Sequence, residues 1–267
     1  MMDDAKTKKI TVASGAEAPV LYKSRQFWED KFRSMGLWSP ILAFDFVSRR
    51  WSQGLDNTFP EFQLVAISGG PGPENRVVGV AHAVPLRLGD QMADLPDTGW
   101  DWALETAMQH HKSGVLPNAI CGLSITVLPE FQRRGVGAIL ISHILSLASR
   151  LKLSSVVMPV RPISKEDDPR LPIEEFLTLR RNDGFHQDAW IRTHQKAGAT
   201  IVKPCARSMT AVAPIADWQY WCDEPFLDSG EHLARGCLAP VQIDIARGTG
   251  TYIEPNVWMH YAVGKQK

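Results

Sequence analysis

Short runs of apolar residues alternate with longer amphipathic segments along this chain. Four apolar runs are too short for helices and are typical of buried strands, at residues 62–68, 77–84, 119–128 and 155–160. The glycines and prolines of residues 69–73 must turn between the first two runs, which predicts a hairpin. Apolar positions at helical spacing predict helices over residues 25–35, 42–51, 138–151 and 188–197. Further strands are expected at 199–202 and 251–263, so the order of elements predicts an α/β fold with a mixed central sheet flanked by helices.

Two connections are longer than a simple link between elements requires. Residues 85–117 contain Trp100, Trp102, His110 and His111, and we expect a lid or binding loop there, with both histidines in a surface loop. Residues 164–187 are rich in proline and charge. The chain from residue 216 is rich in aromatic residues, which predict packing over the sheet, with one or two of them lining a pocket. The expected organisation is a flexible segment over 1–24, one domain over 25–215 with insertions near 85–117 and 164–187, and a C-terminal extension over 216–267 packing on the same domain.

The most informative segment is residues 123–138, a buried strand followed by a turn, two glycines and an apolar helix. Backbone N–H groups of the turn lack partners within an element, and the positive end of the helix dipole lies beside them. Gly135 and Gly137 have no Cβ, so a bulky anion can approach the main chain, and Arg133 and Arg134 add positive charge. This pattern predicts a diphosphate cradle. The alternative is an ordinary strand-to-helix turn whose glycines allow tight packing.

The same segment resembles the acyl-CoA signature of the GNAT superfamily of N-acyltransferases, which is Gln/Arg-x-x-Gly-x-Gly/Ala after a strand. Gln132, Gly135 and the pair Gly137–Ala138 match the signature in register, and Pro129 stands where family strands often end. The resemblance implies a GNAT-type central sheet, and acyl-CoA (acetyl-CoA or malonyl-CoA) as co-substrate with no metal. It implies that the strand end pairs with pantetheine and that the turn binds the diphosphate, through Ile125, Val127, Leu128, Gln132, Arg133, Arg134, Gly135, Val136, Gly137 and Ala138.

Many members of this superfamily place a proton-donating tyrosine four residues before a glycine, and His194 stands at that spacing before Gly198. An imidazole can donate a proton or orient a carbonyl; the alternative is a histidine that only packs within its helix. Many amine-acylating members also carry a carboxylate on the central strand, but residues 119–127 offer only Cys121, Ser124 and Thr126 as polar side chains. We keep Thr126 as a catalytic candidate. Either another residue serves as base or no base is required. His82 is a candidate, although a sheet histidine can be purely structural.

A missing base also fits decarboxylation of a malonyl thioester, which requires donors that stabilise an enolate. The sequence has a looser likeness to the GNAT-like decarboxylase and S-acyltransferase loading domains of polyketide synthases. That likeness rests on residues 160–165, on the Trp-x-Arg-x-His run ending at His194, and on residues 207–209 and 254–259. It implies Ser164 as a hydroxyl partner of the histidine and Arg207 as a ligand for a carboxylate. The alternative for Arg161 and Arg207 is a surface or salt-bridged arginine.

Composition limits the remaining function classes. The 267 residues are 44% hydrophobic and 22% charged, with 29 basic and 29 acidic side chains, so no nucleic-acid-binding surface is indicated. The four cysteines lack metal-ligand spacing, the first residues lack an apolar signal, and residues 138–151 are too short and polar to span a bilayer. We therefore expect a cytoplasmic acyl-CoA-dependent acyltransferase acting on a small molecule. The alternatives are a malonyl-CoA decarboxylase that serves an acyl carrier protein, and a non-catalytic acyl-CoA-binding module.

Overall fold

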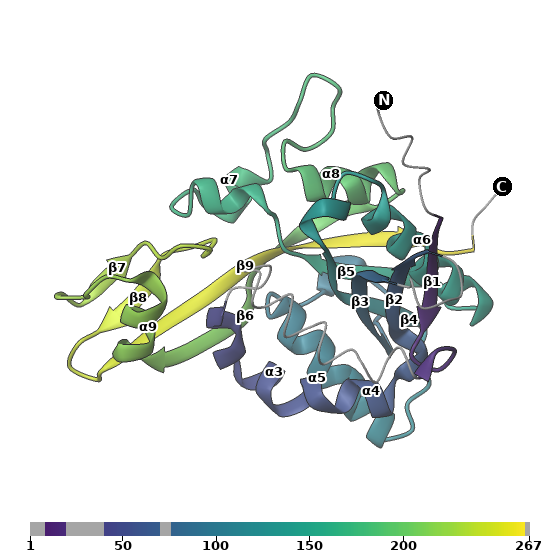
Figure 1. Ribbon diagram of the computed structural model, residues 1–267, viewed down its shortest axis with the longest axis horizontal. Helices are drawn as coiled ribbons and strands as arrows, with labels where there is room; N and C mark the ends of the chain where they lie inside the picture. Colours follow the sequence, from purple (N-terminus) through teal and green to yellow (C-terminus); the bar gives the residue numbers. More distant parts are fainter. Residues whose placement is uncertain (1–8, 20–39, 70–75, 265–267) are drawn as a thin grey trace.

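The computed structural model describes residues 9–19, 40–69 and 76–264. Their strands form one mostly antiparallel sheet of order β1-β2-β3-β4-β5-β9-β8-β7, in which β6 pairs with β9 (Figure 1). The strands are β1 (Ile10–Ser14), β2 (Gln63–Ser68), β3 (Arg76–Leu86), β4 (Ala119–Val127), β5 (Ser155–Val160), β6 (Thr200–Pro214), β7 (Gly230–His232), β8 (Val241–Asp244) and β9 (Thr249–Ala262). Only the β4–β5 pair is parallel, so the mixed α/β sheet predicted from the sequence is confirmed.

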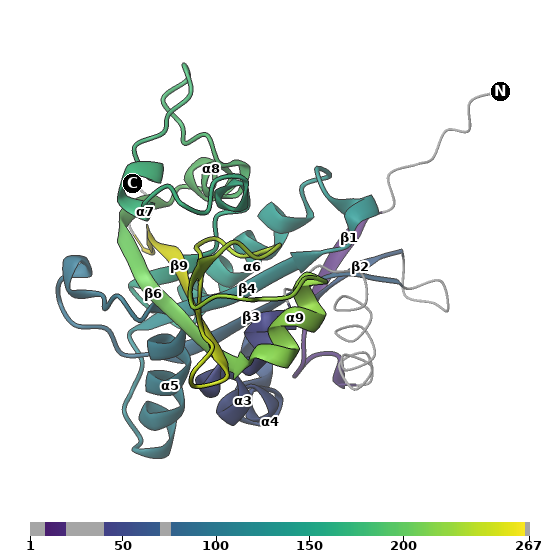
Figure 2. The same ribbon diagram turned by 90° about the vertical axis from the view of Figure 1, so that its left-hand side faces the viewer.

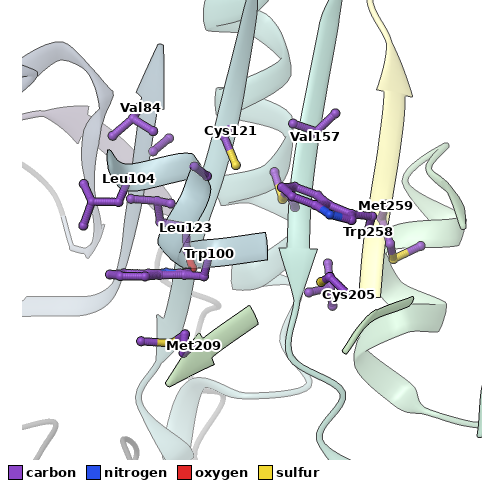
Figure 3. Close-up of a cluster of buried hydrophobic side chains, with 14 of the residues drawn as sticks. Val84, Trp100, Leu104, Cys121, Leu123, Val157, Cys205, Met209, Trp258 and Met259 are labelled. Atoms are coloured by element: carbon purple, nitrogen blue, oxygen red, sulfur yellow. Dashed lines mark hydrogen bonds between the residues drawn. The ribbon is translucent and has the colours of Figure 1, made fainter. Parts of the chain in front are cut away.

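Helices cover both faces of the β1–β5 half of this sheet (Figures 1 and 2). One face is covered by α3 (Phe46–Trp51), α4 (Leu55–Thr58) and α5 (Gly99–Lys112), and the other by α6 (Val136–Arg150). Helix α8 (Ala189–Lys196) packs beside α6 and against β6. The remaining helices are α7 (Ile173–Phe176), α9 (Ile215–Cys222) and the short 3-10 turns η1 (Pro40–Phe44), η2 (Ser52–Gly54), η3 (Pro60–Phe62), η4 (Met92–Asp94), η5 (Pro129–Phe131) and η6 (Ser164–Asp167). Apolar side chains from both layers and the sheet fill a continuous core, part of which Figure 3 shows around Trp100, Leu123 and Trp258.

The long connection before β4 is mainly a packed helix, which corrects the expectation of a lid or binding loop. Helix α5 buries Ala103, Leu104 and Ala107, and it carries His110 and His111 on its last turn. Its first turn is fixed to the core, because the Trp100 amide donates to Ser208 Oγ at 2.9 Å. The local sequence pattern did not predict this helix, because much of the stability of the helix comes from packing of its apolar face on the sheet.

The C-terminal extension lengthens the sheet and is not a layer placed over it. The last part of β9 lies beside β5 in the main sheet and the first part of β6 lies beside β9, and the other halves of β6 and β9 pair with each other beyond it. There β9 also pairs with β8 (Figure 1). Trp218 and Trp258 are fully buried and Tyr261 is 3% exposed, which confirms packing for these aromatic side chains, whereas Tyr220 is exposed.

In the N-terminal part of the chain, the structure differs from the sequence prediction at two elements. Strand β1 pairs with β2 although it lies in the segment predicted to be flexible. The helix predicted over 42–51 is divided at Asp45, whose carboxylate accepts from the Ser48 amide and caps α3. The helix predicted over 25–35 lies outside the described residues. Among the described residues, no helix combines the length and the apolar character needed to cross a bilayer.

Candidate active site

The sheet opens between β4 and β5. The two strands pair only from Ala119 to Cys121 and from Ser155 to Val157. Beyond these rungs β4 continues along β3 alone, with a register shift at His82 and Ala83 that leaves one extra residue, Leu123, on β4. The Leu123 carbonyl accepts from the Trp100 indole at 2.9 Å. The edge of β4 that faces β5 is therefore free of strand partners in the described chain from residue 122 onward.

The candidate pantetheine residues differ in how they lie on this edge. Ile125 and Val127 are half-buried, whereas Thr126 is 8% exposed and lies opposite Val80 of β3. Leu128 is fully buried, and its amide donates to the Val78 carbonyl at 2.9 Å. The Leu128 amide is thus already engaged, and Ile125 and Val127 are the residues best exposed to an extended ligand.

The turn between β4 and α6 has the geometry of an anion cradle. Gly135 adopts φ 81° as the N-cap of α6, and nothing lies within 4 Å of the position where a Cβ would stand. Arg133 also has positive φ, and residues 132–135 are exposed. Within the described chain, the backbone N–H groups of residues 133–138 have no acceptor. Six donors at a helix N-terminus with open space in front suit a diphosphate.

The two other signature positions hold the cradle together. Gln132 Nε2 donates to the Val127 carbonyl at 3.1 Å, which ties the turn to the end of β4. A Cβ on Gly137 would stand 3.0 Å from the Trp190 ring of α8. Gly137 therefore permits the close packing of α8 on α6, whereas the open space expected for a ligand lies at Gly135. Val136 is buried and Ala138 is exposed on the same first turn.

His194 lies on α8 one turn after Trp190, and the two rings are 4.5 Å apart. It is 1% exposed, and its Nδ1 is 2.7 Å from Tyr261 Oη. Its Nε2 is buried and has no partner in the described structure. Burial lowers the pKa of His194 to about 3, so the ring is neutral at physiological pH.

The structure does not bring Ser164 or Arg207 into contact with His194. The Ser164 hydroxyl and amide both donate to Asp188 Oδ2, at 2.9 and 2.7 Å. Asp188 Oδ1 accepts hydrogen bonds from the amides of Trp190 and Ile191 and caps α8. Ser164 is therefore linked to the helix that carries His194 through this capping residue. Arg207 is exposed on an irregular part of β6, with its amide donating to the Asp97 carbonyl at 3.0 Å.

His82 lies opposite Ser124 on the β3–β4 ladder and is 8% exposed. Its Nδ1 is 2.9 Å from Gln63 Oε1. The Gln63 amide nitrogen donates to the carbonyls of Ala83 and Phe59, at 2.8 and 3.1 Å, so its oxygen must face the ring. This arrangement places the proton of neutral His82 on Nδ1 and leaves Nε2 unprotonated.

No family model matches the sequence. Arginine N-acetyltransferase avaD of Aspergillus versicolor is 29% identical over 278 residues, which cover 95% of this chain and 94% of the relative. The loading GNATL domain of CurA from Lyngbya majuscula matches with a TM-score of 0.57 at 15% identity, over 95% of this chain and 98% of that domain. The chain has a GNAT-type fold. Its β4–β5 opening and the turn before α6 are therefore the parts of this GNAT fold to test for acyl-CoA.

The residues of this GNAT site fit acyl-CoA as a co-substrate. The open position at Gly135 and the exposed amides suit the diphosphate, and the free edge of β4 suits an extended pantetheine arm. The unpartnered Nε2 of His194 is a hydrogen-bonding group that a buried carbonyl could satisfy. Among the described residues, no group of three or more histidine, cysteine or acidic side chains could hold a metal ion.

Sequence reasoning missed three residues of this site. Trp100 caps the Leu123 carbonyl from a helix that the sequence analysis did not predict. Tyr261 is the partner of His194 although 67 residues separate them. Asn256 donates to Ser208 Oγ at 2.8 Å and has a buried Oδ1 without a partner in the described chain. No local motif signals these contacts, because each joins elements far apart in sequence.

Proposed function

We propose that this GNAT protein transfers an acyl group from acyl-CoA to the amine of a small molecule. Two observations carry the proposal: the edge of β4 that has no strand partner from residue 122 in the described chain, and the unpaired backbone donors of residues 133–138 at the first turn of α6. The name of the 29%-identical relative, an arginine N-acetyltransferase, supports an amine acceptor the size of an amino acid.

In the proposed complex, the backbone N–H groups of residues 133–138 bind the diphosphate, and Arg133 and Arg134 add charge. Arg134 is already held beside the Phe131 ring, at 5.4 Å from its centroid. The pantetheine arm lies along Ile125 and Val127. The thioester then reaches the point where β4 and β5 separate, next to the layer that contains His194.

The acceptor amine attacks the thioester carbonyl carbon; a C–N bond forms, the C–S bond breaks and CoA leaves as a thiolate. His82 Nε2 takes the proton of the amine. His194 donates its N–H to the carbonyl oxygen as negative charge develops there. Because burial lowers the pKa of His194 to about 3, the residue acts as a neutral donor and is not the acid that protonates the thiolate.

A second candidate function is decarboxylation of a malonyl thioester, with transfer of the acyl group to a carrier-protein thiol. It is favoured by the absence of a carboxylate on β4, residues 119–127. The neutral N–H of His194 could stabilise an enolate as readily as a tetrahedral oxyanion. The two functions share the cradle and differ in the requirement for an amine.

The first experiment is mass spectrometry of the purified protein with acetyl-CoA or malonyl-CoA, each with and without L-arginine. Acetylated arginine, formed only with the amine present, supports the proposed function. Conversion of malonyl-CoA to acetyl-CoA without an acceptor supports the second candidate. CoA binding without turnover, across a panel of amino acids and arylalkylamines, contradicts both and favours a binding module.

His194 is the sharpest test of the catalytic assignment. We expect His194→Ala to lower kcat by about 100-fold with CoA affinity within twofold, because one oxyanion donor is lost while the cradle is untouched. His194→Gln, whose side-chain amide can replace the Nε2–H donor, should retain more activity than the alanine variant. Unchanged kcat in a folded alanine variant would mean that His194 only packs.

A further inference from the structure

His194 and Tyr261 form an isolated polar pair within apolar surroundings. Their side chains are 1% and 3% exposed, and 2.7 Å separates His194 Nδ1 from Tyr261 Oη. In the described chain, this contact is the only hydrogen bond of either side chain, because His194 Nε2 has no partner. The direction of this one hydrogen bond therefore determines which nitrogen of the His194 ring carries the proton.

The phenol must be the donor of this hydrogen bond. If Nδ1–H donated to the phenol oxygen, the phenolic O–H and the Nε2 lone pair would both be buried without partners. If the phenol donates to Nδ1, only one group stays unsatisfied, the N–H on Nε2. Each additional unsatisfied polar group costs about 1–3 kcal/mol, so the second arrangement is favoured.

The location of the pair connects it to the opening in the sheet. Tyr261 lies on β9 opposite Val156 of β5. Val156 is itself paired with Ile120, one rung before the last rung that joins β4 to β5. Trp190, one turn before His194, packs on Gly137 at the start of α6. His194 is thus held between the rung of the sheet where β4 and β5 separate and helix α6, which begins at the cradle.

We propose that Tyr261 is a positioning residue that fixes His194 as a neutral ring with its proton on Nε2, directed at the thioester carbonyl oxygen. This inference rests on the proposed function for the role of the donor, but the tautomer is a property of the protein alone. Tyr261 need not touch the substrate. It determines which nitrogen of His194 carries the proton and holds the plane of the ring.

The tautomer can be measured without substrate. In protein containing ¹⁵N-labelled histidine, the His194 signals are identified by their loss in His194→Gln. We expect wild-type protein to show a protonated Nε2 and an unprotonated, hydrogen-bonded Nδ1. In Tyr261→Phe, the Nδ1 signal should shift to that of a nitrogen without a hydrogen bond. A wild-type spectrum with the proton on Nδ1, or no shift of Nδ1 in Tyr261→Phe, would overturn the proposal.

Kinetics then test the role of the pair. Tyr261→Phe should lower kcat by about tenfold with KM for acyl-CoA within twofold, because a misaligned donor affects the transition state more than binding. Tyr252→Phe is the matched control on the same strand: its hydroxyl contacts Leu238 and Glu254, so the His194 signals and kcat should be unchanged. The expected nitrogen signals in wild-type protein, combined with full activity in His194→Ala, would confirm the tautomer. That result would overturn the role that the proposed function gives to His194, and with it the positioning role of Tyr261 in the reaction.

Discussion

At the scale of single residues, the site depends on backbone conformation and on buried polar atoms that few side chains can supply. Gly135 provides a left-handed residue with open space above it, whereas Gly137 provides contact with Trp190. Two glycines of one signature thus serve different purposes. The ring of His194, in turn, owes its protonation state to burial and to one phenol.

Gly135→Asp tests the cradle. We expect the Kd for CoA to rise by at least about tenfold, because a carboxylate would stand in the proposed diphosphate site. Aspartate at positive φ also strains the backbone, so Gly184→Asp is the control: Gly184 has φ 80°, close to the 81° of Gly135, and equally open space. Calorimetric titration with CoA measures both variants, and an unchanged Kd in a folded Gly135→Asp protein refutes the cradle assignment.

Asp101 makes stability depend on pH. Burial and the neighbouring Asp45 carboxylate raise the pKa of Asp101 to about 9, so its carboxyl is protonated at neutral pH and donates to Asp45. The stability from this group is complete below its unfolded pKa and is lost as pH rises toward 9. The advantage of Asp101→Asn over wild type should grow by up to about 1.4 kcal/mol per pH unit across that range. Urea unfolding at pH 6 and 8 checks this, with the surface variant Asp90→Asn as control.

At the scale of elements, helix α8 is positioned by its cap and by one face. Asp188 is fully buried and accepts four hydrogen bonds, two from the first turn of α8 and two from Ser164. Trp190 packs on α6 and His194 contacts β9 from the same face of the helix. Movement of this short helix would therefore displace the proposed oxyanion donor.

Asp188→Ala should lower the free energy of unfolding by about 2–3 kcal/mol, because several charge-assisted hydrogen bonds are lost and their donors stay buried. Ser164→Ala removes only the hydroxyl and should cost about 1 kcal/mol. Urea denaturation compares the two. If Ser164→Ala instead lowered kcat as much as His194→Ala at unchanged stability, Ser164 would be a catalytic residue and not a support for the cap.

At the scale of the whole molecule, β9 joins the β1–β5 half of the sheet to the C-terminal extension (Figure 1). Side chains near the end of β5 fasten a loop of the extension to the main domain. Arg161 pairs with Glu254 at 3.0 Å and donates to the Gly236 carbonyl, while buried Lys165 donates to the Leu238 carbonyl at 2.9 Å. We propose for this reason that the described part of the extension, residues 216–264, unfolds together with the rest of the described chain as one domain.

Glu254→Gln tests this attachment. The carboxylate is 1% exposed, and without it Arg161 keeps only a carbonyl partner, so we expect a loss of about 3 kcal/mol in a single unfolding transition. The double variant Arg161→Met/Glu254→Leu should recover part of that loss, because no buried charge stays unpaired. Two separate transitions in wild-type protein would contradict a single cooperative domain.

The sequence by itself determined the features that local chemistry specifies. Residues 155–160 read as a strand because every position is apolar or small, and the 123–138 signature predicted the turn and helix of the cradle because glycine, arginine and helix-start preferences act over a few residues. It did not reveal α5, the β7–β8 hairpin or the division at Asp45. These elements depend on packing partners that are distant along the chain.

Only the tertiary structure decided how the candidate residues of the site relate to one another. It joined His194 to Tyr261, assigned the Ser164 hydroxyl to Asp188 and fixed the His82 ring through Gln63. Hydrogen-bond direction and burial set the protonation state of a histidine, and both arise from contacts across the sheet. A local motif can specify a backbone cradle, but the state of a catalytic side chain depends on the whole fold around it.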